Sequence, residues 1–238
     1  MFKYMAILTL NWLVLILTIP ILLIFILLKI LRLKTLSDHY LLAVCNLWGH
    51  IVFGSTGSRV QVVGRENLPS DTAFCLMANH QSSLDIPLVI GFIPRVVGFI
   101  AKKELKWMPI INVWMKSIHC VFIDRKNARQ SLKSLETALE RIHRGDSLVI
   151  FPEGTRSKSG SMNPFKTGNI RMVIRTGVPI LPVSIDGTHQ ILREPNRVHS
   201  APIRLVIHPL IRTQALSTAE SEALPQKLQT LIGSEIKL

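Results

Sequence analysis

The sequence predicts an α/β fold, with a mixed, mostly parallel sheet flanked by helices and preceded by an N-terminal two-helix membrane anchor. Three observations predict it. A long uncharged apolar run opens the 238-residue chain. From about residue 58, short β-branched segments alternate with amphipathic ones, and turn residues separate them. No internal repeat or low-complexity tract interrupts the alternation. We therefore expect an anchor at residues 1–57 and one catalytic-sized domain at residues 58–238.

The apolar run from Tyr4 to Leu28 contains no charged residue. As a helix it would extend about 37 Å, more than the hydrocarbon core of a bilayer, which is about 30 Å thick. A secretory signal is the competing interpretation, but the run is longer than a typical signal and ends in cations: Lys29, Arg32 and Lys34. Because only Lys3 precedes the run, the positive-inside rule places the following domain on the cytoplasmic face, at the inner membrane if the source is bacterial.

A second apolar stretch, Tyr40–Phe53, follows a candidate helix cap at Ser37 and Asp38. It is too short to span a bilayer comfortably. Pro20 can kink the first helix, so two arrangements stay open. Either the pair enters one leaflet and returns, or the first helix spans while the second lies in the interface.

The net charge of +13 suits either nucleic acid or an anionic membrane as partner. The apolar N-terminus and the lack of zinc-finger, P-loop and RNA-binding signatures argue against nucleic acid. The eight histidines show no metal-ligand spacing, so we expect no metal site. Three cysteines in apolar stretches, without C-x-x-C spacing, indicate free thiols and a reducing compartment.

Periodicity predicts the elements of the second region. The predicted strands are Arg59–Val63, Ala73–Ala78, Val97–Ala101, Cys120–Ile123, Ser147–Phe151, Ile180–Ser184 and Ile203–His208. The predicted helices are Leu84–Gly91, Pro109–Lys116, Ala128–Arg144, Gly168–Arg175 and Thr218–Gly233. The third of these is the best defined, because Gly145 follows it as a stop and four apolar residues recur on one face: Leu132, Leu135, Leu139 and Ile142.

The segment Asn79–Asp85 joins a predicted strand to a predicted helix, where side chains are held at the edge of a sheet. Ser82 and Asp85 fit a capping box, which would give Asp85 a structural task. Asp85 can also reach back to one imidazole nitrogen of His80, fix its tautomer and stabilise its protonated form. Both interpretations can hold together, and the second makes His80 a candidate general base.

A second polar cluster follows the fifth predicted strand. A Pro-Gly turn explains Pro152 and Gly154 only. It does not explain the carboxylate of Glu153, the hydroxyl of Thr155 and the guanidinium of Arg156 around a glycine that lets a ligand approach the backbone. This loop suits a polyol phosphate held by Arg156.

Four blocks in order resemble the 1-acyl-sn-glycerol-3-phosphate (lysophosphatidic acid) acyltransferases and their glycerolipid relatives, over roughly Gly64 to Gly187. His80 and Asp85 match the His-x4-Asp motif of that family. The other three blocks are Lys102, Glu104, Leu105 and Pro109 with residues 122–125, then Phe151–Ser157 with Phe165, Lys166 and Gly168, and finally Val178–Val183.

The resemblance implies the glycerolipid acyltransferase fold and a catalytic role for His80 and Asp85. It implies acceptor and phosphate binding by Glu153, Gly154, Thr155, Arg156, Lys102 and Arg125. It also implies acyl-CoA or acyl carrier protein as co-substrate, a lysophospholipid acceptor, no cofactor, and a domain held to the bilayer. Asn112 and His119 stand where many members have glycine, which bears on the acceptor more than on acyl transfer.

Histidine titrates at about pH 6.5, which suits His80 for removing a proton from an attacking hydroxyl. No G-x-S-x-G elbow occurs and the cysteines lie in apolar runs, so we expect direct transfer without an acyl-enzyme. A thioester donor fits, because a thiol with a pKa of about 8.5 leaves with little help from an acid.

The expected reaction moves a fatty acyl group onto the sn-2 hydroxyl of lysophosphatidic acid and gives phosphatidic acid. Three alternatives stay open. The acceptor is another lysophospholipid or glycerol-3-phosphate, the enzyme is a membrane-bound lipid hydrolase that activates water, or the chain is a non-catalytic basic membrane-binding protein.

Overall fold

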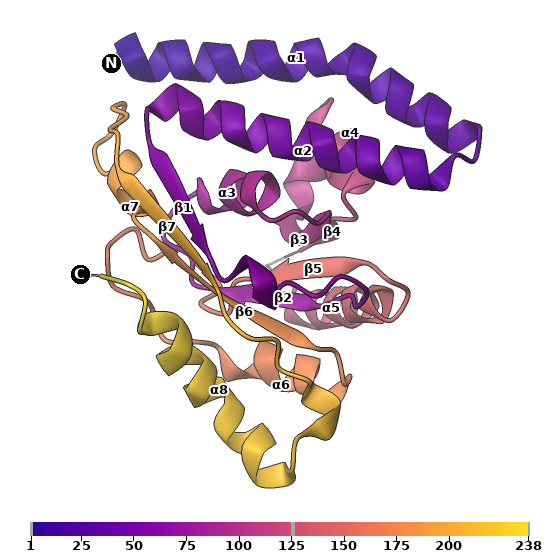
Figure 1. The fold of residues 1–238 in the computed structure, drawn as a ribbon, viewed down its shortest axis with the longest axis vertical. Helices are drawn as coiled ribbons and strands as arrows, with labels where there is room; N and C mark the ends of the chain where they lie inside the picture. The colour runs from indigo at the N-terminus through magenta and orange to yellow at the C-terminus, as the bar shows by residue number, and fades with distance from the viewer. Residues whose placement is uncertain (1, 125–126, 238) are drawn as a thin grey trace.

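The computed structural model describes residues 2–124 and 127–237, with the side chains of residues 2–4, 6–8, 10–12, 14–15, 128 and 129 left out of the description. Figure 1 shows how the elements are arranged. The strands are β1 (Arg59–Val63), β2 (Cys75–Ala78), β3 (Val97–Lys102), β4 (Val121–Ile123), β5 (Ser147–Ile150), β6 (Ile180–Asp186) and β7 (Pro202–Ile207). The α-helices are α1 (Phe2–Ile30), α2 (Lys34–Thr56), α3 (Asp85–Phe92), α4 (Ile111–Ser117), α5 (Ala128–Ile142), α6 (Thr167–Arg175), α7 (Thr188–Ile191) and α8 (Thr218–Gly233), and short 3-10 turns are η1 (Arg65–Asn67), η2 (Lys103–Trp107) and η3 (Thr213–Ala215).

The described strands form one sheet in the order β1-β7-β6-β2-β5-β3-β4. Neighbouring strands run parallel except for β6 and β7, which are antiparallel. The predicted mixed, mostly parallel sheet is therefore confirmed. Each predicted strand is present, with its ends shifted by at most two residues.

The sheet is covered on both faces, as Figure 1 shows, with α1, α2 and α3 stacked over one face and α5, α6 and α8 on the other. Strand β2 explains why. Its four residues are fully buried, and Leu76 and Ala78 join the core cluster of α1–α3 while Cys75 and Met77 join the cluster of α5, α6 and α8. Successive strand side chains point to opposite faces, so a strand buried on both faces reads as an unbroken apolar run.

The two N-terminal helices form an antiparallel pair, but α2 begins earlier than the sequence predicted. The predicted cap at Ser37 and Asp38 is wrong, because α2 starts at Lys34 and the turn occupies residues 31–33. Ser37 lies inside the helix, where its hydroxyl donates to the Lys34 carbonyl (2.7 Å). Asp38 instead pairs with Lys29 of α1 (3.2 Å), so both residues serve the turn between the helices.

Helix α2 packs against α3 through two glycines. A Cβ atom on Gly49 would lie 2.3 Å from the Gly91 Cα atom and 2.6 Å from the Pro87 carbonyl oxygen. Both neighbours are backbone atoms, so they cannot rotate away. The two helices therefore approach as closely as they do because neither carries a side chain at the contact.

Exposed large apolar side chains concentrate on α1 and α2. Leu17, Leu23 and Ile30 of α1 are 61%, 60% and 70% exposed. Within the parts of the chain that the structure describes, no helix combines the length and the hydropathy that crossing a bilayer requires. The membrane anchor stays a prediction, as do its two arrangements.

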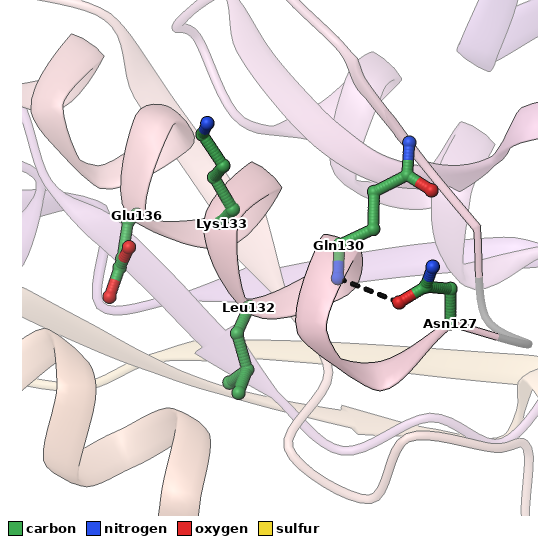
Figure 2. A pocket seen from close by; sticks show the side chains of 5 residues that line it. All are labelled: Asn127, Gln130, Leu132, Lys133 and Glu136. Carbon is green, nitrogen blue, oxygen red and sulfur yellow. Dashed lines mark hydrogen bonds between the residues drawn. The ribbon is translucent and has the colours of Figure 1, made fainter.

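Helix α5 begins at Ala128 as predicted but ends at Ile142, two residues before the predicted end at Arg144. The Asn127 side chain caps it by accepting from the Gln130 N–H (3.0 Å), as Figure 2 shows. Of the four apolar residues that recur on one face, Leu135, Leu139 and Ile142 are buried, whereas Leu132 is 51% exposed. Leu132 lies near the start of α5, the helix that packs against β4 at one edge of the described sheet.

Candidate active site

Polar loops from several strands meet at one edge of the sheet. Strands β6, β2, β5, β3 and β4 all run in the same direction, so their carboxyl ends lie at the same edge. His80 follows β2, Glu153 follows the neighbouring β5, and Thr188 follows β6 on the other side. Ligands bind at this edge in open α/β sheets.

His80 and Asp85 form a direct pair. The His80 Nδ1 atom lies 2.7 Å from Asp85 Oδ2. The Asp85 side chain is fully buried and the His80 side chain is 15% exposed. Phe151 stacks on the imidazole, with ring centroids 4.0 Å apart and planes 13° from parallel. The imidazole is therefore held in its plane by Phe151 and in its orientation by Asp85.

The predicted capping box is half formed. Asp85 Oδ2 accepts from the Ser82 N–H (2.9 Å), as the box requires. The Ser82 hydroxyl, however, accepts from the Leu84 N–H (3.3 Å) rather than from the Asp85 N–H. The same carboxylate oxygen thus caps the turn and bonds to His80, so the structural and the dyad interpretations hold together.

Asp85 also has a partner that the sequence analysis missed. The Thr188 hydroxyl, which is fully buried, donates to Asp85 Oδ1 (2.5 Å). Thr188 is far from Asp85 in sequence and meets it only because β6 pairs with β2. The sequence offered one signal for this contact: Thr188 is a polar residue just after β6, a strand that ends at the same sheet edge as β2.

Asn79 extends the pairing of β2 and β6 by one step with its side chain. Its Nδ2 donates to the Ile185 carbonyl and its Oδ1 accepts from the Ile185 N–H, both at 2.8 Å. The Asn79 side-chain amide thus makes the two hydrogen bonds that a backbone residue would make in a continuing strand. His80, the next residue, is thereby fixed at the end of the strand.

Glu153 connects the second polar loop to His80. Its Oε1 accepts from the His80 N–H (2.5 Å) and its Oε2 accepts from the Asn163 N–H (2.8 Å). The Ser157 N–H in turn donates to the His80 carbonyl (2.8 Å). Burial raises the pKa of the Glu153 carboxyl, against the backbone donors that lower it. Both carboxylate oxygens of Glu153 therefore accept hydrogen bonds from backbone N–H groups. Acceptor binding by Glu153 stays a prediction.

Gly154 lies at the turn of this loop with φ of 74°, a conformation that favours glycine. A Cβ atom there would lie 2.9 Å from the Lys166 Nζ atom, so the Lys166 side chain extends over the Gly154 backbone. The sequence placed Lys166 in the third block without a role. The structure adds its ammonium group to the cations of this loop.

The remaining predicted site residues are either exposed to solvent or lie outside the residues that the structure describes. Thr155 and Arg156 are exposed on the loop that holds Glu153. Lys102 is exposed at the end of β3, which is two strands from β2 in the sheet. Arg125 lies outside the described residues. Binding roles for these four residues stay predictions.

The thiols of the domain lie apart from this chemistry. Cys75 and Cys120 are free and buried. Burial raises the pKa of the Cys120 thiol to about 12 and raises that of Cys75 still further. Since the thiolate is the nucleophile, neither side chain suits an acyl-enzyme.

Comparison with known proteins agrees with the geometry. The family model described as acyltransferase matches residues 59–186, more than half of the chain. A 1-acyl-sn-glycerol-3-phosphate acyltransferase of Cocos nucifera is 36% identical over 174 residues, which are 71% of this chain and 56% of that protein. The protein of that name from Borreliella burgdorferi is 30% identical over 183 residues, which are 76% of this chain and 73% of that protein.

A solved structure is also similar. The 1-acyl-sn-glycerophosphate acyltransferase PlsC of Thermotoga maritima superimposes with a TM-score of 0.76 at 28% identity, covering 93% of this chain and 95% of that one. The chain spans between 56% and 61% of the length of the plant relatives from Cocos nucifera and Limnanthes douglasii. The chain belongs to the acyltransferase family, and its predicted resemblance to the 1-acyl-sn-glycerol-3-phosphate acyltransferases is confirmed.

Proposed function

We propose that this chain transfers a fatty acyl group from a thioester, acyl-CoA or acyl carrier protein, to the sn-2 hydroxyl of lysophosphatidic acid, giving phosphatidic acid. The observation that carries the proposal is the His80–Asp85 pair, 2.7 Å apart and bonded to the Glu153 loop at the same sheet edge. The names of the similar proteins support the choice of acceptor.

His80 acts as the general base. Asp85 occupies Nδ1, so Nε2 is the nitrogen that accepts the proton of the acceptor hydroxyl. The hydroxyl oxygen bonds to the thioester carbonyl carbon as that proton moves to His80. The carbon–sulfur bond of the tetrahedral adduct then breaks, and the departing thiolate takes the proton back from His80. No residue of the protein is acylated, and no cofactor or metal takes part.

The cations of the site suit a phosphorylated acceptor. Arg156 is exposed on the loop around Gly154, and the Lys166 side chain extends over the Gly154 backbone. A guanidinium binds phosphate oxygens in pairs, and an ammonium adds a point charge. Lys102 at the end of β3 adds a third cation at this edge.

The membrane supplies the acceptor in this proposal. The exposed apolar side chains of α1 and α2 contact lipid, and the domain lies on the cytoplasmic face. A lipid acceptor then reaches the site without leaving the bilayer surface.

An acyl-transfer panel tests the proposal. Purified protein is given acyl-CoA or acyl carrier protein donors with lysophosphatidic acid, other lysophospholipids, glycerol-3-phosphate or no acceptor, and products are identified by mass spectrometry. We expect phosphatidic acid from lysophosphatidic acid and little thioester loss without acceptor. Preferred acylation of another acceptor would replace lysophosphatidic acid in the proposal, and acceptor-independent thioester loss would indicate a hydrolase.

A further inference from the structure

A buried threonine lies on the far side of Asp85 from His80. Thr188 is the first residue of α7, and its side chain is fully buried. Its hydroxyl donates to Asp85 Oδ1 (2.5 Å), while Asp85 Oδ2 bonds to His80 Nδ1 (2.7 Å). Each carboxylate oxygen therefore has its own side-chain partner, and the carboxylate plane is defined from both sides.

This hydrogen bond favours the form of the pair that accepts a proton. The pair carries a net negative charge when His80 is neutral and no net charge when His80 is protonated. A hydroxyl that points its hydrogen at Asp85 stabilises the more negative form, and burial strengthens the effect. The other titratable groups nearby are Glu153, which accepts from the His80 N–H, and His189, whose Nδ1 lies 3.3 Å from the Gln81 amide.

Gln81 continues the chain of bonds behind Thr188. The hydroxyl of Thr188 has one hydrogen, which goes to Asp85, so the Gln81 amide atom 3.4 Å away can bond to it only by donating. The amide orientation that turns Nε2 toward Thr188 satisfies this requirement. In the opposite orientation, Gln81 Oε1 faces Thr188, and the buried Gln81 Nε2 atom has no hydrogen-bond partner among the described residues. Gln81 is itself only 2% exposed.

We propose that Thr188 is a positioning residue of the His80–Asp85 pair, whose hydroxyl orients Asp85 and stabilises the proton-accepting form of His80. The kinetic part of this proposal rests on the proposed function. The hydrogen-bond geometry and the titration of His80 are independent of which acceptor the enzyme uses.

Three variants test the proposal. Thr188→Val removes the hydroxyl and keeps the shape, and Thr188→Ser restores the hydroxyl. Thr213→Val is the matched control, because Thr213 is also buried and donates one hydrogen bond, to the Val178 carbonyl (2.8 Å) near the opposite end of β6. Circular dichroism and thermal unfolding establish that each variant is folded, and Thr188→Ala replaces Thr188→Val if that variant is not.

The measurements are kcat and KM across pH, and the titration of the His80 ring by NMR, assigned with His80→Ala. For Thr188→Val we expect kcat to fall about 10- to 100-fold with KM nearly unchanged. The acidic limb of the rate profile and the His80 titration should both move to higher pH, because the more negative form of the pair loses a hydrogen bond. Thr188→Ser should stay close to wild type, and Thr213→Val should lose stability without either change.

Two results would overturn the proposal: a folded Thr188→Val protein with the wild-type His80 titration, or the same shifts in Thr213→Val. If the wild-type protein transfers no acyl group to any acceptor, the proposed function has failed. The His80 titration still decides the role of Thr188 in that case.

Discussion

Asp85 accepts three hydrogen bonds with two oxygens, from His80, Ser82 and Thr188. The spacing of His80 and Asp85 predicts the first of these bonds, because both residues lie in one short segment at a strand end. That spacing does not predict the third bond, from Thr188. It joins two loops that become neighbours only when β2 and β6 pair.

Replacing either member of the pair should remove catalysis and leave the fold intact. We expect His80→Ala to abolish turnover, since no other base among the described residues of the site is bonded to a carboxylate in this way. Asp85→Asn should lower kcat by about 10³- to 10⁴-fold, because an amide can stabilise the wrong histidine tautomer. Steady-state kinetics, with circular dichroism as the folding control, check both. A folded His80→Ala enzyme with substantial turnover would refute the mechanism.

Arg156 should discriminate between acceptors. Arg156→Ala should lower kcat/KM for phosphorylated acceptors by about 10- to 100-fold, the range of a charge-assisted hydrogen bond. Acceptors without a phosphate should lose much less. Arg171→Ala, which removes an exposed arginine of α6, is the control. Equal losses for both acceptor classes would mean that Arg156 does not bind the phosphate.

At the scale of elements, periodicity and turn residues predict each strand and the helices from α3 to α6 and α8, because apolar spacing records which face is buried. They do not predict α7, a single turn of four residues with no period to detect. The spacing also does not distinguish exposed Leu132 from the buried apolar residues on its face of α5. Spacing identifies the apolar face of a helix but not how far neighbouring elements cover it.

The contact between α2 and α3 should tolerate no side chain at Gly49. Gly49→Ala would place its Cβ atom 2.3 Å from backbone of α3, so the helices must separate. We expect a loss of about 1–3 kcal/mol in the free energy of unfolding, as in other overpacked contacts. Gly54→Ala is the matched control on the same helix, because nothing lies within 4 Å of its Cβ position. That change should be neutral or stabilising by up to about 1 kcal/mol. Chemical denaturation measures both, and equal effects would argue against the glycine contact.

The link between β6, β7 and α8 should weaken in acid. The Ser184 hydroxyl donates to the Ile232 carbonyl (2.7 Å), so His208 Nε2, 2.8 Å from the same oxygen, must donate to it. Burial lowers the pKa of His208. Below about pH 6.5 the unfolded chain therefore binds a proton that the folded chain lacks, and this contribution to stability is lost as pH falls.

Thermal unfolding across pH tests this link. The wild-type Tm should decrease from pH 7 to pH 5, and His208→Gln, which keeps an N–H donor, should show a shallower decrease. If Tm decreases equally with pH in the wild type and in His208→Gln, groups other than His208 cause the acid sensitivity.

At the scale of the whole molecule, the proposed membrane association depends on the outer face of α1. Leu23, Leu27 and Ile30 are 60%, 53% and 70% exposed and lie on one face of the helix. Replacing all three with Ser should lower binding to vesicles at least tenfold, because each buried apolar side chain contributes about 1.5–3 kcal/mol.

Flotation with phosphatidylcholine vesicles, with and without phosphatidylglycerol, measures this association. Leu132→Ser is the control, because Leu132 is similarly exposed but lies on α5. The net charge of +13 predicts stronger binding to the anionic vesicles, and that difference should diminish in high salt. Binding that the triple substitution leaves unchanged would remove α1 from the interface.

The sequence by itself determined the fold class, the strands, the family and the His80–Asp85 pair, because these depend on local spacing and on blocks of adjacent residues. Only the tertiary structure revealed that Thr188 bonds to Asp85, that Glu153 holds the backbone of His80, and that Lys166 extends over Gly154. Each of these contacts joins different segments of the chain. Strand order and loop packing set such distances, and no local pattern in a single sequence records them.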